Sequence, residues 1–542
     1  MFQSRLYSFS LAIGLTPKLY RELHTANVGM HDMSKMTKGF MTKVIKLRKK
    51  FTKKLIAFTR RIPMIAFRLS NARHTRALQS PVKWLAKTRI NLKHIELPSF
   101  PEETTLLCET TFPTYAWQLH LAKGVNSIRH GSGVETNTGS VFEGVWNGAF
   151  EKFDFDKADY VYGSGIKHGE KLTITPPTHM FEGVFILYCK DKQELFAANS
   201  LACCIAALPQ EDQALWLVEL AENMTAINNK QTELGFYKYN TKVAQIAQWE
   251  LHCLFAHNFV LAPSVPIDVT LRTNVANFDN FAGYEAFVTS VLRQVVENGG
   301  SPHRKNGPLS AVSCISTGYD STAVTAIAKT IGVDDALTLD IDVKGVNDCG
   351  DEVAKQLGVS CRSFIHPAGK SIDHLHMLYT EDLRGIASEF VGTPGFGDDI
   401  LYAAFEDVLS DTILLDGGAG DSVWAIDSTH TEGMPISAPY SKSINEFRLR
   451  VGFAYIPAPS IGADFPEAIA RISRSDEMKP FSIGGKYDRS IPRRLAEAAG
   501  AKRESFGQKK KAANPHPINL DTLKYDALRE MVSRYALKTP RA

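Results

Sequence analysis

The sequence has no run of about 18 uncharged apolar residues, which is the length that a membrane-spanning helix requires. It also has no C-x-x-C pair among its eight cysteines. Since most of these cysteines lie in apolar runs, we expect reduced, buried thiols in an intracellular, cytoplasmic protein. Cys108 lies inside the strand-like stretch TTLLCETTF and is expected in the core. His366, His374 and His376 offer zinc ligands, but ordinary hydrogen-bonded or exposed histidines are the favoured interpretation.

Acidic residues are missing from residues 33–95, where Lys and Arg number 18. Because residues 1–32 carry a net charge of +1 and the whole chain carries +4, residues 96–542 carry −15. The chain therefore joins a basic arm, residues 1–95, to an acidic body. Its first 30 or so residues contain one short apolar patch and favour either a targeting segment or a disordered lead.

Within the arm, from about residue 41 to residue 93, basic residues alternate with Leu, Ile and Phe, and Pro63 and Pro81 interrupt the pattern. Two basic amphipathic helices are the expected structure. Three roles stay open for residues 33–95: a solvated or partner-packed helix pair, binding of a polyanion such as nucleic acid, and binding of an anionic membrane surface.

The body has ordinary globular composition, because 44% of the whole chain is hydrophobic and 10% aromatic. Its most informative stretch is LSAVSCISTGYDSTAVTAIAKTIG, residues 309–332. The first eight residues are apolar and β-branched and predict a buried strand, followed by a turn of Ser316, Thr317 and Gly318 and a helix from about Ser321. A helix start offers free N–H groups and a positive dipole end to an anion, such as a phosphate. Asp320 can hold magnesium on the same phosphates.

This stretch resembles the phosphate loop of asparagine synthetases and their relatives, the PP-loop ATP pyrophosphatases, which reads Ser-Gly-Gly-x-Asp-Ser. The matching residues are Ser316, Gly318, Asp320 and Ser321. Thr317 replaces the first Gly and so alters the pyrophosphate cradle. The resemblance covers roughly residues 275–515. It implies an α/β domain at residues 271–520, with the parallel sheet of the adenine nucleotide alpha hydrolase-like fold, that binds ATP and Mg²⁺.

Three further pieces follow in the family's order. The run ALTLDIDV, residues 336–343, resembles the second strand, whose Leu339 would join the nucleotide-binding residues. The helix after it would carry Asp348 and Glu352. The run TILLDGGAGD resembles the next strand and its acidic loop, so that Asp421 falls on the metal-binding Asp and would share the ion with Asp320.

The third piece is residues 486–513, KYDRSIPRRLAEAAGAKRESFGQKKKAA, which resembles the closing helix and the Lys segment after it. By this resemblance Lys509 or Lys510 reaches the ATP phosphates. The acidic loop departs from the family, because Gly418 and Ser422 stand where the family has two Glu residues. A carboxylate that would orient the substrate or move a proton is therefore missing there, while the matched ATP-binding residues remain.

Residues 96–270 predict a separate α+β domain with antiparallel strands, such as FEGVFILYC and ELFAANS, and a helix at about residues 209–227. Its position weakly resembles the glutaminase half of asparagine synthetases. In that family the nucleophile is a Cys freed at the mature N-terminus, so that its own amino group can serve as the base. This chain begins Met1-Phe2-Gln3, and no cysteine lies near an obvious processed start. We therefore expect a scaffold without glutaminase activity.

A helix with an apolar stripe is expected after residue 271, ending at Gly299 and Gly300, and residues 521–542 form a C-terminal helix and tail. The segment 447–466 is expected to line a dry pocket. The leading hypothesis is an ATP-dependent amide-forming ligase that adenylates a carboxylate and passes it to ammonia or an amine. A catalytically degraded binding or structural protein and a PP-loop nucleobase or tRNA modification enzyme are the alternatives, and the sequence leaves the oligomeric state open.

Overall fold

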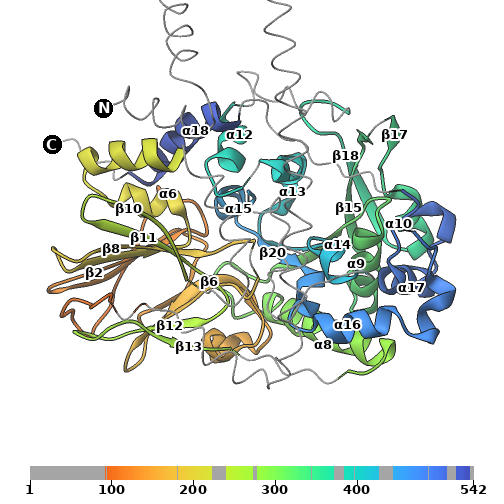
Figure 1. The fold of residues 1–542 in the computed structure, drawn as a ribbon, viewed down its shortest axis with the longest axis horizontal. Helices are drawn as coiled ribbons and strands as arrows, with labels where there is room; N and C mark the ends of the chain where they lie inside the picture. Colours follow the sequence, from red (N-terminus) through yellow and green to blue (C-terminus); the bar gives the residue numbers. More distant parts are fainter. Residues whose placement is uncertain are drawn as a thin grey trace, which may run out of the picture. The chain divides into compact units, whose positions relative to one another are not determined.

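The computed structural model describes residues 92, 94–179, 181–221, 240–272, 278–343, 345–370, 384–395, 397–425, 443–485, 487–509 and 520–536. The chain divides into two compact units, Met1–Ala86 and Lys87–Ala542. All the described residues belong to the second, which we call the main unit (Figure 1). Apart from Leu92, His94 and Ile95, the arm and its expected helices lie outside the described residues.

The first sheet has seven strands in the order β1-β3-β2-β9-β8-β11-β10, and its neighbours are antiparallel except for the parallel pair β1 and β3. The strands are β1 (Thr105–Cys108), β2 (Trp117–Ala122), β3 (Val125–His130), β8 (Val184–Cys189), β9 (Glu194–Ala198), β10 (Asn240–Ile246) and β11 (Trp249–Leu254).

The second sheet has six antiparallel strands in the order β13-β12-β7-β6-β5-β4. They are β4 (Glu135–Asn137), β5 (Ser140–Trp146), β6 (Val161–Lys167), β7 (Leu172–Thr175), β12 (Asn258–Leu261) and β13 (Asp268–Thr270). Two short 3₁₀ helices, η2 (Phe150–Lys152) and η3 (Phe155–Lys157), lie between β5 and β6 in the chain.

The two sheets face each other and form a sandwich (Figure 1). Alternate residues of their strands, such as Leu119 and Ile186 in the first sheet and Ile174 in the second, are fully buried in one apolar cluster. The outer face of the first sheet is covered by α6 (Leu201–Ala206), the helical residues 210–221 and α18 (Leu520–Tyr535). The antiparallel pairing expected for the runs that contain β8 and β9 is confirmed.

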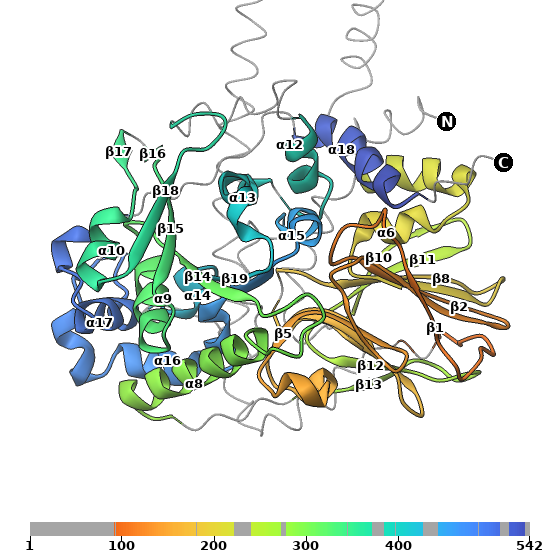
Figure 2. The ribbon, with the colours of Figure 1, turned by 180° about the vertical axis from the view of Figure 1, so that it is seen from behind.

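The other large part of the main unit is built on five parallel strands in the order β18-β15-β14-β19-β20. The strands are β14 (Ser310–Cys314), β15 (Asp335–Leu339), β18 (Ser360–Phe364), β19 (Thr412–Asp416) and β20 (Ala454–Pro457). The main unit is therefore mixed α/β with a parallel sheet, as the sequence predicted. Figure 2 shows β14 and β19 side by side in the middle of the molecule.

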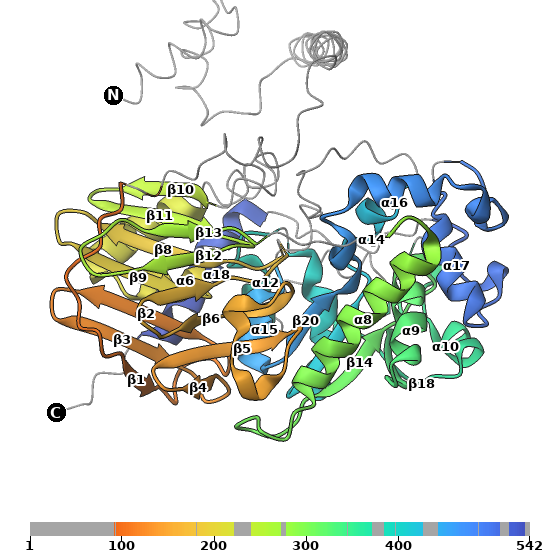
Figure 3. The same ribbon diagram turned by 90° about the horizontal axis from the view of Figure 1, so that it is seen from below.

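The helix expected after residue 271 is α8 (Phe281–Gly299), with its stripe from Tyr284 to Val295 in the core. It packs beside α9 (Tyr319–Thr330), which contacts β14, β19 and α17 (Ser490–Ala498), as Figure 3 shows. The remaining elements are α10 (Asp351–Leu357), α12 (Arg384–Val391), η5 (Asp398–Phe405), α13 (Glu406–Leu409), α14 (Gly420–Val423), α15 (Asn445–Val451), η6 (Ala458–Gly462), α16 (Pro466–Ser473), η7 (Asp476–Phe481) and η8 (Arg503–Ser505).

The strand order places a topological switch point between β14 and β19. The chain leaves β14 through α9 toward β15 on one side, and it leaves β19 toward β20 on the other. In open parallel sheets the two connections at such a point leave a crevice at the carboxyl ends of the strands, where ligands bind. The loops after Cys314 and Asp416 therefore flank the preferred position for a site.

A buried ionic network joins the sandwich to the parallel-sheet part. Arg448 of α15 donates to both oxygens of Glu143 in β5, at 2.6 and 3.1 Å, and lies 2.7 Å from Glu182. All three side chains are at most 4% exposed. Burial raises the pKa of Glu182 to about 7, against the opposing effect of Arg448. The network fixes the two parts to each other through contacts far apart in the sequence.

Several sequence expectations are corrected. Cys108 is exposed rather than in the core, because β1 is an edge strand of the first sheet. The strand expected at residues 336–343 ends at Leu339, and the following residues form a separate hairpin of β16 (Asp342–Val343) and β17 (Val346–Asn347). Asp348 precedes α10 instead of lying on it. The segment 447–466 supplies most of α15 together with β20 and η6, and many of its apolar residues belong to the core, while its expected role in lining a pocket stays a prediction.

All eight cysteines are free thiols, four of them buried and three half-buried. No helix in the described part of the chain combines the length and the apolar character needed to cross a lipid bilayer.

Candidate functional site

The turn after β14 is held by its own side chains. The Gly318 N–H donates to Ser316 Oγ, and the Ser316 N–H donates to Ser321 Oγ, both at 3.0 Å. Thr322 Oγ1 donates to the Gly318 carbonyl at 2.7 Å. These bonds fix the start of α9 at Tyr319, where Gly318 is an N-cap without a side-chain cap bond. Since the first N–H groups of a helix need partners and carry partial positive charge, this end suits a phosphate.

Thr317 ties this turn to two other segments. Its hydroxyl donates to an Asp348 carboxylate oxygen, and its N–H donates to the Asp348 carbonyl at 3.3 Å. The Thr317 carbonyl accepts the Gly507 N–H at 2.8 Å. The side chain that replaces the family's glycine therefore has a structural role, because it links the loop to the segment before α10.

Asp320 packs directly against the loop that follows β19. A Cβ added to Gly420 would lie 2.2 Å from Asp320 Oδ1, and one added to Gly417 would lie 2.7 Å from the Ser321 backbone nitrogen. Only a residue without a side chain allows this approach. The glycines of the sequence GGAGD thus let the Asp320 carboxylate pack against Gly420, the residue before Asp421.

Asp421 lies at the start of the short helix α14 and faces the same region. Its carboxylate accepts a hydrogen bond from the Tyr319 hydroxyl and lies 3.9 Å from Arg489 Nη2. The Arg489 guanidinium also lies 5.9 Å from the centre of the Tyr319 ring. A cation from the segment before α17 is therefore placed between the two loops.

Two tyrosines lie among these carboxylates. The rings of Tyr319 and Tyr487 lie 4.7 Å apart, and burial raises the pKa of both hydroxyls. Asp320 and Asp421 raise both pKa values further, and Asp348 adds to the effect on Tyr487. Carboxylates from three separate segments thus surround one tyrosine pair.

This charge suits a hard divalent cation, because Mg²⁺ prefers oxygen ligands and commonly binds through one or two carboxylates together with phosphate oxygens and water. In the described part of the chain, the three carboxylates do not converge to within 4.8 Å of one another. Asp320 and Asp421 therefore fit an ion that is shared with a bound phosphate, not a closed protein cage.

Lys509 is exposed at the end of the segment that follows η8. Two residues earlier, the Gly507 N–H donates a hydrogen bond to the Thr317 carbonyl and attaches this segment to the turn before α9. A Cβ added to Gly507 would lie 3.2 Å from the Tyr319 Cβ. The segment is thus fixed at Gly507 against the turn before α9, two residues before Lys509, and Lys510 lies outside the described residues.

Asp416, the last residue of β19, was not singled out by the sequence. Its Oδ2 accepts the Tyr455 hydroxyl at 2.9 Å and the Gly418 N–H at 2.8 Å, and burial raises its pKa. A Cβ on Gly418 would lie 2.9 Å from the Tyr455 hydroxyl and 3.0 Å from Asp416 Oδ2. A larger side chain at position 418 would therefore have to displace the Tyr455 hydroxyl and the Asp416 carboxylate.

The other predicted residues are less central. Leu339 is half-buried at the end of β15, and Ser422 is half-buried in α14. Both ring nitrogens of His366 are in hydrogen-bond contact with backbone groups, Ile400 O at 3.1 Å and Ala368 N at 3.1 Å, as the favoured interpretation required. His374 and His376 lie outside the described residues.

Sequence reasoning missed four residues of the site: Tyr319, Asp416, Tyr455 and Arg489. Two of these had a signal, because Tyr319 lies inside the loop motif and Asp416 ends the strand that neighbours β14. Tyr455 lies in the segment 447–466 that was expected to line a pocket, and Arg489 lies in the matched residues 486–513. Neither was singled out, since only the folded chain brings β20 and the segment before α17 to this edge of the sheet.

No protein-family model matches the chain, and no curated protein matches it. Among solved structures, the crystal structure of a predicted subunit of tRNA methyltransferase from Methanocaldococcus jannaschii is 18% identical over 38% of this chain and 95% of that chain, with a TM-score of 0.18. A glutamine-dependent NAD+ synthetase from Acinetobacter baumannii in complex with ADP is 16% identical over 44% of this chain and 52% of that chain, with a TM-score of 0.19. Likeness at this level has no bearing on the function of this chain.

Proposed function

We propose that the chain is an ATP-dependent amide-forming ligase, which adenylates a carboxylate and transfers the acyl group to ammonia or an amine. One observation carries the proposal. At the switch point of the parallel sheet, the Asp320 carboxylate packs against Gly420, and the next residue, Asp421, accepts a hydrogen bond from Tyr319 at the N-terminal end of α9. Backbone N–H groups and paired carboxylates at one sheet edge are what a magnesium-bound polyphosphate requires.

In this proposal the loop of Ser316, Thr317 and Gly318 would hold the phosphates, Ser321 would support it from α9, and Leu339 would contact the nucleotide. Asp320 and Asp421 would hold Mg²⁺, which when bound neutralises phosphate charge and fixes the phosphate oxygens. The carboxylate of the substrate attacks the α-phosphorus, the bond to the bridging oxygen breaks, and pyrophosphate leaves. Charge then builds on the departing oxygens.

Two cations are available for that charge. Lys509 has an exposed side chain and lies two residues after Gly507, whose N–H donates to the Thr317 carbonyl, and Arg489 lies 3.9 Å from Asp421 and 5.9 Å from the centre of the Tyr319 ring. A fixed positive charge at the departing group stabilises the transition state more than the ground state. We assign Lys509 to the pyrophosphate and Arg489 to the orientation of the Asp421 carboxylate.

The second half-reaction needs a base, because the amine that attacks the acyl carbon loses a proton as AMP leaves. We propose Asp416, whose raised pKa brings it closer to neutral pH than an ordinary Asp. It replaces the carboxylate that is missing at Gly418, and the Tyr455 hydroxyl orients it. In this proposal the carboxylate that acts as the base lies two positions earlier in the chain, at residue 416 instead of residue 418.

The sandwich is proposed to be a glutaminase-like scaffold that does not hydrolyse glutamine. Its Cys108 is exposed on an edge strand, whereas Cys203 and Cys204 are buried, and burial raises the pKa values of both thiols. A neutral buried thiol is a poor nucleophile. Free ammonia or a primary amine would serve as the donor, and glutamine would release no glutamate.

The test is ATP–pyrophosphate exchange by the full-length protein with Mg²⁺ and a pool of candidate carboxylates. We expect exchange in the wild type and a loss of about 10²-fold or more in Asp320→Asn, Asp421→Asn and Lys509→Ala. Matched controls are Asp334→Asn and Lys479→Ala, whose side chains are 64% and 74% exposed and pair with Lys329 and Asp476. Neither control should change the rate.

Calorimetry with ATP and Mg²⁺ separates the remaining outcomes. If the protein binds ATP but catalyses pyrophosphate exchange with none of the carboxylates, it is a nucleotide-binding protein and not a ligase. The replacement of two acidic residues by Gly418 and Ser422 would then explain the lost activity. Unchanged binding in both Asp variants would show that the site itself is misassigned.

A further inference from the structure

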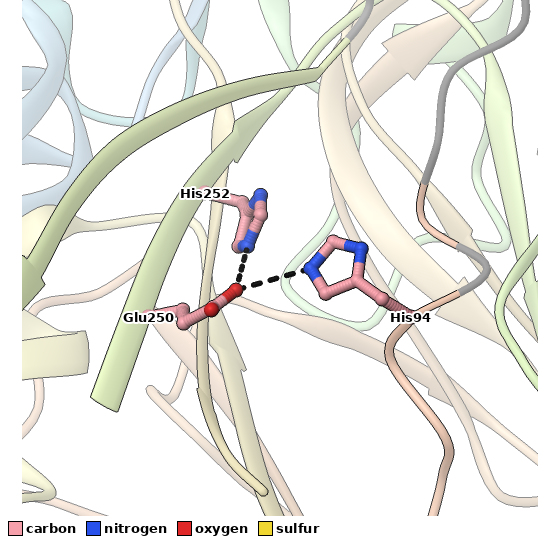
Figure 4. A group of neighbouring side chains, drawn as sticks. All are labelled: His94, Glu250 and His252. Atoms are coloured by element: carbon pink, nitrogen blue, oxygen red, sulfur yellow. Dashed lines mark hydrogen bonds and ion pairs between the residues drawn. The ribbon is translucent and has the colours of Figure 1, made fainter. Parts of the chain in front are cut away.

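Two histidines and a glutamate meet in the first sheet of the sandwich, outside the nucleotide site (Figure 4). His94 Nε2 lies 3.0 Å and His252 Nε2 lies 3.3 Å from the same atom, Glu250 Oε2. The three ligand atoms are within 4.8 Å of one another. In the described part of the chain, no other group of three or more His, Cys, Asp or Glu side chains meets this condition.

The fold explains why these side chains converge. Glu250 and His252 are two positions apart on β11, so they point to the same face of the first sheet. Their alternate neighbours Trp249 and Leu251 pack under the helices on the other face. Glu250 and His252 therefore face the inner side of the sandwich, at its rim.

His94 reaches this rim from a segment 156 positions earlier. The buried side chains of Leu92 and Ile95 hold that segment in the sandwich core, and the Tyr188 hydroxyl donates to the Glu96 carbonyl at 2.9 Å. Tyr188 is the cross-strand partner of Glu250. The position of His94 is thus fixed by packing on both sides.

We propose that His94, Glu250 and His252 form a binding site for a divalent transition-metal ion of the zinc class. Two imidazole nitrogens and one carboxylate oxygen are ligands that Zn²⁺ takes in proteins, at about 2.0–2.2 Å. In a tetrahedron with bonds of that length, ligand atoms are separated by roughly 3.3 Å. The separations of 3.0 and 3.3 Å from Glu250 Oε2 are close to this edge, and the two imidazole nitrogens lie within 4.8 Å of each other.

The site is open on one side. The side chain of His252 is 1% exposed and that of Glu250 is 19% exposed, whereas that of His94 is 46% exposed. An ion can therefore enter past His94, and a water molecule completes the tetrahedron. Because the ligands come from both ends of the sandwich sequence, the ion would tie the end of the basic arm to β11 and stabilise that junction.

The experiment titrates chelator-treated full-length protein with Zn²⁺ by calorimetry at neutral pH. We expect one tight equivalent, a higher melting temperature in the presence of Zn²⁺, and at least tenfold weaker binding in His94→Ala and Glu250→Gln. His94→Ala is the informative variant, since its exposed side chain can be removed without opening the core. Its melting temperature without metal should equal that of the wild type.

The matched control is His120→Ala. His120 Nε2 lies 2.9 Å from Glu194 Oε1 on neighbouring strands of the same sheet, with side chains 29% and 22% exposed. This pair has the same kind of His–Glu contact but no second histidine, so the loss of the His120 side chain should leave the Zn²⁺ affinity unchanged. Because none of these residues belongs to the nucleotide site, ATP binding should be equal in all variants, and the outcome does not depend on the proposed ligase.

Co²⁺ distinguishes this site from the eight thiols. We expect the visible absorption of tetrahedral Co²⁺ without a sulfur-to-metal charge-transfer band, and its loss in His94→Ala. A sulfur band, equal affinity in His94→Ala and wild type, or no tight equivalent would each overturn the proposal. In the last case the cluster is an ordinary carboxylate that accepts two imidazole N–H groups.

Discussion

At the scale of single residues, Gly420 has the least freedom in the nucleotide site. Gly420→Ala would place a methyl group 2.2 Å from Asp320 Oδ1, which forces apart the two loops that carry the proposed magnesium ligands. We expect this variant to lose at least tenfold in affinity for ATP with Mg²⁺, measured by calorimetry, while the main unit still folds.

Gly169→Ala is the matched control, because the nearest atom to its added Cβ is the Lys171 carbonyl oxygen at the ordinary distance of 3.8 Å. Both variants add one methyl group to the chain, so their effects on the unfolded state should be equal. A Gly420→Ala protein that binds ATP like Gly169→Ala would show that Asp320 does not need its contact with Gly420.

The pKa of Asp416 can be tested separately. Burial raises this pKa, and the Tyr455 hydroxyl lowers it by donating to the carboxylate. Tyr455→Phe removes that bond, so the pKa should rise further. If Asp416 is the base for amide formation, the limb of the kcat/KM profile that climbs with pH should move to higher pH.

Tyr188→Phe is the control, since that hydroxyl donates to the Glu96 carbonyl in the sandwich.

The Asp416 carboxyl also affects folding stability. The pKa of Asp416 is higher in the folded protein than in the unfolded chain. Its contribution to the free energy of unfolding is therefore fully present below the unfolded pKa and is lost as pH rises through the folded pKa. An unmoved pH profile in Tyr455→Phe would remove Asp416 from the mechanism.

At the scale of elements, the loop before α9 depends on segments outside its own motif. Thr317 connects it to Asp348, and Gly507 connects it to the chain after η8. Thr317→Val keeps the shape of the side chain but removes its hydroxyl, and a lost bond to a carboxylate costs about 1.5–3 kcal/mol. We expect ATP affinity to fall by roughly tenfold or more, and Thr317→Ser to restore it.

Thr330→Val provides the comparison at the other end of α9, where the Thr330 hydroxyl donates to the Ile327 carbonyl at 2.7 Å. That bond lies within the helix and touches no other segment. Equal ATP affinity in Thr317→Val and Thr330→Val would mean that the loop keeps its shape without Asp348.

At the scale of the whole molecule, Arg448 decides whether the sandwich and the parallel-sheet part unfold together. Arg448→Met leaves Glu143 and Glu182 buried without their cation, which should lower the free energy of unfolding by about 3–5 kcal/mol. The loss should be larger at pH 8 than at pH 5, because the raised pKa of Glu182 keeps it neutral only in acid. Denaturant unfolding at both pH values measures this.

Arg471→Met is the surface comparison. Its side chain is 60% exposed and lies 3.4 Å from Asp279, so its loss should cost at most about 1 kcal/mol. Combining Arg448→Met with Glu143→Gln and Glu182→Gln should recover part of the stability, since no buried charge is then left. If Arg448→Met costs no more than Arg471→Met, the network does not hold the two parts together.

Local patterns were enough to predict several elements. The strand, turn and helix of residues 309–332 and the helix α8 follow from hydrophobic periodicity and from glycines at turns and helix ends, whereas the strand β19 was predicted only from the family resemblance. The antiparallel pair of β8 and β9 has the same basis. These features depend on residues within one or two turns of each other, so the sequence contains the information directly.

Features that depend on distant neighbours were missed or predicted wrongly. Cys108 has an apolar setting in the sequence, yet its strand lies at a sheet edge, and nothing local marks an edge. Asp348 was expected on a helix, but its bond to Thr317 fixes it in the segment before α10.

The sequence by itself determined that a strand, a turn and a helix follow one another at residues 309–332 and that a basic arm precedes an acidic body, because short-range order and composition define them. Only the tertiary structure decided which side chains meet: Asp416 with Tyr455, Arg448 with Glu143, and His94 with Glu250 and His252. The physical reason is that such contacts arise from strand order and sheet packing, which no short stretch of the chain specifies.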